Sequence, residues 1–153
     1  MAGEAQAYLE RLDYLRGEIK NTIHEMTQEE LNWAPLEKDT NSAWVLAVHA
    51  AGTESFWIHQ MVGGIDAHRN RDAEFNASGQ SVAELETLLD KTAKVTHDTL
   101  QSLSSDELAQ TKESGSEGDS VSFRYSILHT IEHLGQHLGH LTLTKQLYTG
   151  RNK

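Results

Sequence analysis

The residues of this chain that could do chemistry are its histidines. Four of the nine lie within the twelve residues from His129 to His140. On a helix, residues four positions apart project from the same side, about 6 Å apart along the axis, so their imidazoles can reach one metal ion. His129, His133 and His137 form two such pairs, but the outer two are about 12 Å apart, too far for one ion. The spacing therefore predicts a metal-binding pair, either His129 with His133 or His133 with His137.

A third ligand must come from another helix, because catalytic zinc-like sites normally use at least three protein ligands. The helix predicted near residues 42–62 carries His49 and His59, which lie about 15 Å apart along the axis and cannot share an ion. Glu54 and Glu132 could be ligands or bases, but a single glutamate on a helix is more often solvated. The histidines without a partner at metal-ligand spacing are interpreted as surface or supporting residues: His24, His59, His68 and His97.

The elements that must position these histidines are helices. The chain contains one proline, Pro35, and long stretches without helix breakers, which favours an all-α protein. Helices are predicted over residues 5–25, 42–62, 81–103 and 122–148, with apolar residues recurring every three or four positions. Asn41 or Ser42 is expected to cap the second of these helices, and Ser81 the third. The polar segment 64–80 is suited to crossing the end of a bundle, and segment 111–120 is predicted to be a mobile loop. We therefore expect a four-helix bundle with long crossing connections.

Leucines are concentrated in the last predicted helix, and we expect them in the core or in an interface. They are Leu128, Leu134, Leu138, Leu141, Leu143 and Leu147.

Composition restricts the classes of partner. The 153 residues suit one domain spanning 1–153, and 37% hydrophobic with 24% charged residues is typical of a folded protein with a polar surface. A net charge of -10 disfavours nucleic acid and membrane surfaces as partners. Cysteine is absent, so any metal must be bound by nitrogen and oxygen. The first residues fit neither a signal peptide nor a membrane span, which predicts a cytoplasmic location.

Two segments, in this order and at this separation, resemble the DinB superfamily. The first is LNWAPLEKDTNSAWVLAVHAAGTESFW, residues 31–57, which is similar to a tryptophan-proline connector followed by a serine-capped helix with one metal ligand. The second is ILHTIEHLGQHLGHLTLTKQL, residues 127–147, which is similar to the helix with a His-x-x-x-His pair. The intervening RNRDAEFNASGQSVAELETLLD also resembles the family's linker and third helix.

This resemblance implies the ligand set and the class of reaction. It places the first ligand on His49 and the pair on His133 and His137, with His129 as a neighbour. Many members have arginine, glycine and glutamine after the last ligand, whereas Leu138, Gly139 and His140 follow here, so a polar contact to substrate is altered and His140 could replace part of it. The resemblance further implies a homodimer and S-transfer from a low-molecular-weight thiol, such as bacillithiol or mycothiol, to a small electrophile.

The chemistry of three neutral imidazoles is compatible with that expectation. They leave a divalent ion its full charge and an open position, which can activate a bound thiol or water. Imidazole suits several transition metals, and zinc or nickel is expected here. Two alternatives remain open at this point: metal-dependent hydrolysis of a small amide or ester, and a non-catalytic metal-binding stress protein. No catalytic residue beyond the three ligands is predicted.

Overall fold

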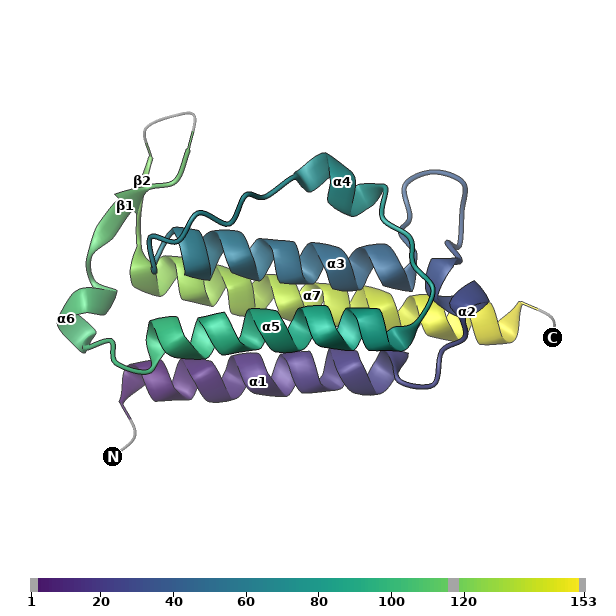
Figure 1. The fold of residues 1–153 in the computed structure, drawn as a ribbon, viewed down its shortest axis with the longest axis horizontal. Coiled ribbons are helices and arrows are strands. Elements are labelled where there is room, and N and C mark those ends of the chain that lie inside the picture. Colours follow the sequence, from purple (N-terminus) through teal and green to yellow (C-terminus); the bar gives the residue numbers. More distant parts are fainter. Residues whose placement is uncertain (1–2, 116–118, 152–153) are drawn as a thin grey trace.

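Four long helices lie side by side along the molecule in the computed structural model, which describes residues 3–115 and 119–151 (Figure 1). They are α1 (Glu4–Ile23), α3 (Ala43–Glu54), α5 (Val82–Leu100) and α7 (Phe123–Gly150). Helix α7 contacts α1 and α3, and α5 contacts the same two helices, so the four enclose a common core. The prediction of an all-α four-helix bundle is confirmed.

Side-chain caps set the starts of several helices, as the sequence predicts for the helix near residue 42, whereas α1 begins after Gly3 without one. Ser42 Oγ accepts a hydrogen bond from the backbone N–H of Val45 at 3.2 Å, at the start of α3. Ser122 Oγ does the same for α7, accepting from the N–H of Tyr125 at 3.0 Å. Thr27 and Glu30 form a reciprocal capping box at the short helix α2 (Gln28–Asn32). Each cap satisfies backbone donors that the first helical turn leaves free, which fixes where the helix begins.

The long connection between α3 and α5 runs back along the bundle, because these two helices point in the same direction (Figure 1). It contains a short helix, α4 (Arg71–Phe75), in which Asn70 Oδ1 accepts from the N–H of Ala73 at 3.0 Å. The sequence predicts a crossing connection here but not this helix, since five residues in a polar segment carry no apolar period. Helix α4 covers the outer side of α3.

Two predicted segments differ in the structure. The predicted helix 42–62 is interrupted: α3 ends at Glu54 and continues as a π-helix, η1 (Ser55–Gln60), whose wider turn was not indicated by the apolar pattern. The predicted loop 111–120 contains β1 (Thr111–Glu113), which pairs antiparallel with β2 (Ser120–Ser122), and α6 (Ser105–Leu108) precedes it. The loop prediction is therefore wrong for the two strands, while residues 116–118 of that segment lie outside the described residues.

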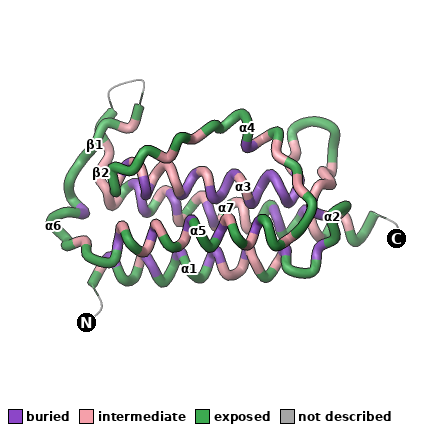
Figure 2. The backbone as a smooth tube through the Cα atoms, in the orientation of Figure 1, coloured by how far each residue is buried: buried purple, intermediate pink, exposed green. Residues whose placement is uncertain are grey.

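The core lies along the facing sides of the four long helices, where buried positions recur every three or four residues (Figure 2). Among the leucines of α7, Leu134 and Leu141 are buried as expected. The expectation of a core position is wrong for Leu128, Leu143 and Leu147, which are 47%, 53% and 45% exposed, so an interface role for them stays a prediction.

Among the described helices, none has both the length and the apolar character needed to cross a lipid bilayer.

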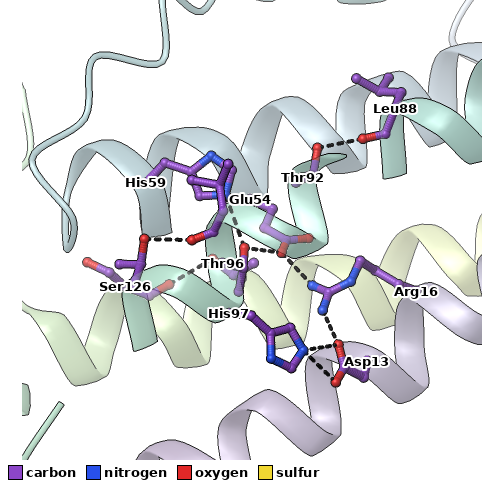
Figure 3. A network of polar contacts seen from close by, with 12 residues as sticks. Asp13, Arg16, Glu54, His59, Leu88, Thr92, Thr96, His97 and Ser126 are labelled. Carbon is purple, nitrogen blue, oxygen red and sulfur yellow. Dashed lines mark hydrogen bonds and ion pairs between the residues drawn. The ribbon is translucent and has the colours of Figure 1, made fainter. Parts of the chain in front are cut away.

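Glu54 was expected to be solvated, but it is fully buried in the core. The guanidinium of Arg16, also buried, pairs with Glu54 and with Asp13, and the Thr96 hydroxyl donates to Glu54 (Figure 3). His59, buried as well, lies with its Nε2 atom 3.1 Å from Thr96 Oγ1. Burial raises the pKa of Glu54, while the charge of Arg16 opposes that rise. This network links α1, α3, η1 and α5 and explains His59 as a core residue.

We expect that removing one member of the Arg16–Glu54 ion pair lowers the free energy of unfolding. Arg16→Met leaves a buried carboxylate without its cation, and such changes typically destabilise a fold by about 3–5 kcal/mol. The double variant Arg16→Met with Glu54→Leu removes both charges and should recover most of that loss. Urea unfolding of the wild type, of Arg16→Met and of the double variant measures this directly. A double variant no more stable than Arg16→Met would contradict the assignment.

Candidate metal centre

The three histidines that the sequence selects meet at the contact between α3 and α7. His49 on α3 is buried, and its Nε2 atom lies 3.2 Å from Nε2 of His133 on α7. One helical turn further along α7, His137 Nε2 lies 3.1 Å from the same atom of His133. One ring nitrogen from each of the three lies within 4.8 Å of the others. Residues 84 positions apart in the chain thus present nitrogen atoms to one point.

The spacing of these nitrogens fits a bound transition metal. A tetrahedral ion with bonds of about 2.0–2.1 Å holds its ligand atoms about 3.3 Å apart, close to the two distances observed. A neutral imidazole binds such ions through the lone pair of its unprotonated ring nitrogen, which can be Nε2. Lone pairs directed at one another repel unless a proton or a cation lies between them. Three imidazoles without a carboxylate or thiolate form a donor set that suits zinc, nickel or copper.

The other histidines are arranged differently. His129 packs its ring on Trp57 with centroids 4.7 Å apart, and its centroid lies 6.1 Å from that of His133. The alternative pair of His129 with His133 therefore includes a ring that is engaged elsewhere. His140 is exposed, with its ring centroid 5.4 Å from that of His137. Three others form exposed contacts with carboxylates, as surface residues were expected to do: His24, His68 and His97. The side chain of Glu132 is exposed.

A carboxylate that the sequence analysis missed orients His49. Glu74, on α4, lies with Oε2 2.7 Å from Nδ1 of His49, so the imidazole donates its Nδ1–H and keeps Nε2 free as an acceptor. Arg69 binds the same carboxylate through two hydrogen bonds of 2.7 and 2.9 Å and also donates to Thr53 Oγ1 at 3.1 Å. The ring of Phe75 packs on that of His49, with centroids 4.7 Å apart. Helix α4 thus fixes both the proton and the plane of this imidazole.

The Glu74 carboxylate has room beside α3 because residue 52 is glycine. A Cβ atom at Gly52 would lie 2.1 Å from Glu74 Oε1, far inside contact distance. The obstructed atom is the tip of a side chain and not backbone, so an alanine there would displace the carboxylate more than the helix. Neither a glutamate in a polar linker nor a glycine in a helix carries a sequence signal for this contact. The contact between Glu74 and Gly52 becomes apparent only in the structure, where the connection between α3 and α5 packs on α3.

Burial keeps the imidazoles neutral. Burial lowers the pKa of His133 to about 3 and that of His137 to about 4, and repulsion from neighbouring histidines acts in the same direction. Burial also lowers the pKa of His49, although the Glu74 carboxylate acts the other way. In the described part of the chain, the Nδ1 atoms of His133 and His137 are buried without a hydrogen-bond partner. Glu74 is therefore the carboxylate on which the orientation of the site depends.

Two hollows lie along the α3–α7 contact, on either side of the histidines. A pocket of about 180 Å³ is bounded by His49 and His133 together with Thr53, Trp57, Arg69, Arg71 and His129. A larger groove of about 740 Å³ lies between α7 and the connector before α3. Leu46 and His140 line it, and each lies three residues from a site histidine. Of the two hollows, the pocket is the one that site histidines line directly, through His49 and His133.

Comparison with known proteins agrees with this architecture. A family model described as mycothiol-S-transferase matches residues 7–150. A solved structure, described as a conserved protein from Enterococcus faecalis, has a TM-score of 0.81 at 17% identity, covering 98% of this chain and 99% of that chain. At that identity the likeness shows a shared fold. The chain matches none of the curated proteins with which it was compared. The resemblance to the DinB superfamily, to which the matching family is related, is confirmed.

Substitution of single histidines tests the ligand set. His49→Ala, His133→Ala and His137→Ala should each lower the metal content of the purified protein sharply, because each removes one of three ligands. His129→Ala and His140→Ala should retain it. Elemental analysis of folded, tag-free variants gives the result. If His129→Ala empties the site while His137→Ala stays loaded, the pair is displaced by one helical turn.

Glu74 and Gly52 should influence metal affinity without being ligands. Glu74→Gln replaces the carboxylate by a weaker acceptor, and losing such an orienting partner typically lowers metal affinity about 10- to 100-fold. Gly52→Ala should give a similar loss by displacing the carboxylate. Competition with a chromophoric chelator measures the affinity. Gly135→Ala on α7, where an added Cβ meets nothing within 4 Å, is the matched control; equal affinities for it and Gly52→Ala would refute the role of Glu74.

The metal-free protein should lose stability on mild acidification. The histidines of the unfolded chain bind protons near pH 6.5, whereas His133 and His137 in the folded chain do so only near pH 3 and 4. Between these values the unfolded chain binds more protons, so the free energy of unfolding falls as pH decreases below about 6.5. Urea unfolding at pH 7.5 and 5.5 measures the fall. The double variant His133→Gln with His137→Gln should lose less free energy of unfolding between pH 7.5 and 5.5 than the wild type does. An equal loss in both proteins would exclude these two histidines as the cause.

Proposed function

The chain belongs to the mycothiol-S-transferase family, and from this premise we propose that it transfers a small thiol to an organic electrophile at a metal centre formed by His49, His133 and His137. The observation that carries the proposal is the meeting of three imidazole nitrogens at one point, beside a pocket open to a substrate. A closed structural site would use a fourth protein ligand, and among the described residues the cluster contains three.

His49, His133 and His137 would hold a divalent ion, which when bound would supply activation of the thiol by lowering its pKa. Zinc or nickel is the proposed ion. The chain's own residues keep this site ready: burial holds the imidazoles neutral at physiological pH, and Glu74 fixes which nitrogen of His49 faces inward. The carboxylate itself is held by Arg69 and does not face the pocket.

The two hollows support a reaction with two substrates. The groove of about 740 Å³ has the volume of a typical small-molecule site, whereas the pocket of about 180 Å³ suits a much smaller molecule. We assign the larger thiol to the groove and the electrophile to the pocket, so that sulfur and carbon meet at the histidines. In the transfer, the sulfur forms a bond to carbon, the leaving group departs with the electrons of its bond, and the proton of the thiol passes to solvent.

A panel of thiols tests the proposal. Metal-loaded, tag-free protein should accelerate the reaction of mycothiol or bacillithiol with 1-chloro-2,4-dinitrobenzene, and a chelator should abolish the acceleration. The absence of cysteine removes background from protein thiols. His137→Ala should abolish activity, while His24→Ala, which changes an exposed histidine, should not. A metal-loaded protein that accelerates no thiol of the panel would contradict S-transfer and favour a metal-binding role without catalysis.

A further inference from the structure

The pocket of about 180 Å³ differs in charge from the rest of the molecule. The chain has a net charge of -10, yet the charged side chains that line this pocket are two arginines, Arg69 and Arg71. No carboxylate is among its lining residues in the described part of the chain. A cationic hollow on an acidic protein concentrates anions locally, because nearby charges of the lining act more strongly than the distant net charge. The ligand of the pocket should therefore carry negative charge.

The two arginines are not equivalent. Arg69 is half-buried, and its charge is neutralised by the two hydrogen bonds to Glu74. Arg71 is exposed, and its guanidinium stacks over the ring of Phe75 at 5.0 Å from the centroid. Among the described residues, no carboxylate forms an ion pair with Arg71. Its donors remain available, and the stacking on Phe75 limits the positions that the guanidinium can take.

The side of the pocket formed by η1 and α7 carries aromatic rings. The rings of Trp57 and His129 pack at 4.7 Å, and the ring of Tyr125 stacks on His129 at 5.9 Å with an interplanar angle of 13°. Trp57 and His129, which line the pocket at an interplanar angle of 58°, each offer a ring against which a small group can pack. The volume is about that of six water molecules, since a water occupies about 30 Å³ of liquid. The pocket therefore suits a carboxylate with a few attached carbon atoms.

We propose that Arg71 is a substrate-binding residue that pairs with a carboxylate group of a substrate, held against Trp57 and His129. A guanidinium presents a planar fork of N–H donors that matches a carboxylate with two hydrogen bonds. The ring of Phe75 contacts both the guanidinium of Arg71 and the imidazole of His49. An anion paired with Arg71 would therefore be bound beside the histidines. The inference rests on the proposed S-transfer and names one substrate class for it, a small carboxylate-bearing electrophile.

Iodoacetate and iodoacetamide form a matched pair of electrophiles for the test, since they differ in the carboxylate alone. In both reactions the thiol sulfur bonds to the methylene carbon, iodide leaves with the bonding electrons, and the thiol proton goes to solvent. Arg71→Gln should lower kcat/KM for iodoacetate about tenfold or more, mainly by raising KM, because a charge-assisted hydrogen bond is lost. The value for iodoacetamide should change less than twofold. Equal losses for both electrophiles would overturn the proposal.

A carboxylate on the thiol could be the group that Arg71 binds, and a second pair distinguishes this source. With iodoacetamide as electrophile, N-acetylcysteine and N-acetylcysteamine differ only in the thiol's carboxylate. If Arg71→Gln lowers kcat/KM with N-acetylcysteine but not with N-acetylcysteamine, the carboxylate that Arg71 binds belongs to the thiol. That result would overturn the assigned substrate class. Arg11→Gln is the matched control, because Arg11 stacks in the same way over Tyr14 on α1, at 4.8 Å. It should change none of these values.

A binding measurement separates this inference from the proposed function. Acetate should shift the NMR signal of the Trp57 indole N–H in a saturable way, acetamide should not, and Arg71→Gln should weaken acetate binding about tenfold. This experiment needs neither thiol nor turnover. If acetate binding depends on Arg71 while every transfer assay fails, the anion pocket stands and S-transfer falls. If acetate and acetamide act alike, or Arg71→Gln binds acetate as the wild type does, the role of Arg71 is refuted.

Discussion

The packing of α3 against α7 is the constraint on which the rest of the structure depends. These helices run in opposite directions, so residues that precede His49 lie beside residues that follow His137, and residues that follow His49 lie beside His129. A shift of one helical turn, about 5.4 Å, would separate His49 from its partners. The same alignment puts Leu46 and His140 at the groove and Thr53 and His129 at the pocket. The site and the two hollows beside it therefore follow from one helix contact.

The structure uses buried charge in two different ways. In the core, Arg16 and Glu54 form an ion pair that links α1 to α3, and the Thr96 hydroxyl links Glu54 to α5. At the site, Arg69 neutralises Glu74, and the pair orients a neutral imidazole. The first arrangement affects the free energy of unfolding, whereas the second affects how His49 presents its lone pair. In keeping with this difference, Glu54 lies in the core of the bundle, whereas Glu74 lies on α4 in the connection between α3 and α5.

The four long helices and the clustering of His49 with His133 and His137 could be predicted from the sequence, for different reasons, while the role of these histidines as metal ligands stays a prediction. Apolar periodicity is a local signal and locates α1, α3, α5 and α7 to within a few residues, and serine caps mark the starts of α3 and α5. Helical spacing left two pairs open around His133, and family resemblance selected His137. What could not be predicted depends on contacts across the chain: Glu54 lies opposite Arg16, and Glu74 reaches Gly52 through a polar linker. No pattern within either segment indicates such contacts.

Binding of one metal ion by the three imidazoles is tested most directly by X-ray absorption spectroscopy at the metal edge. Protein purified without a histidine tag should contain about one equivalent of a transition metal per chain. Its spectrum should show about three imidazole nitrogens at 2.0–2.1 Å, the distance typical of a zinc–nitrogen bond. A first shell of oxygen without imidazole scattering, or a folded protein that retains no metal after loading, would contradict the claim.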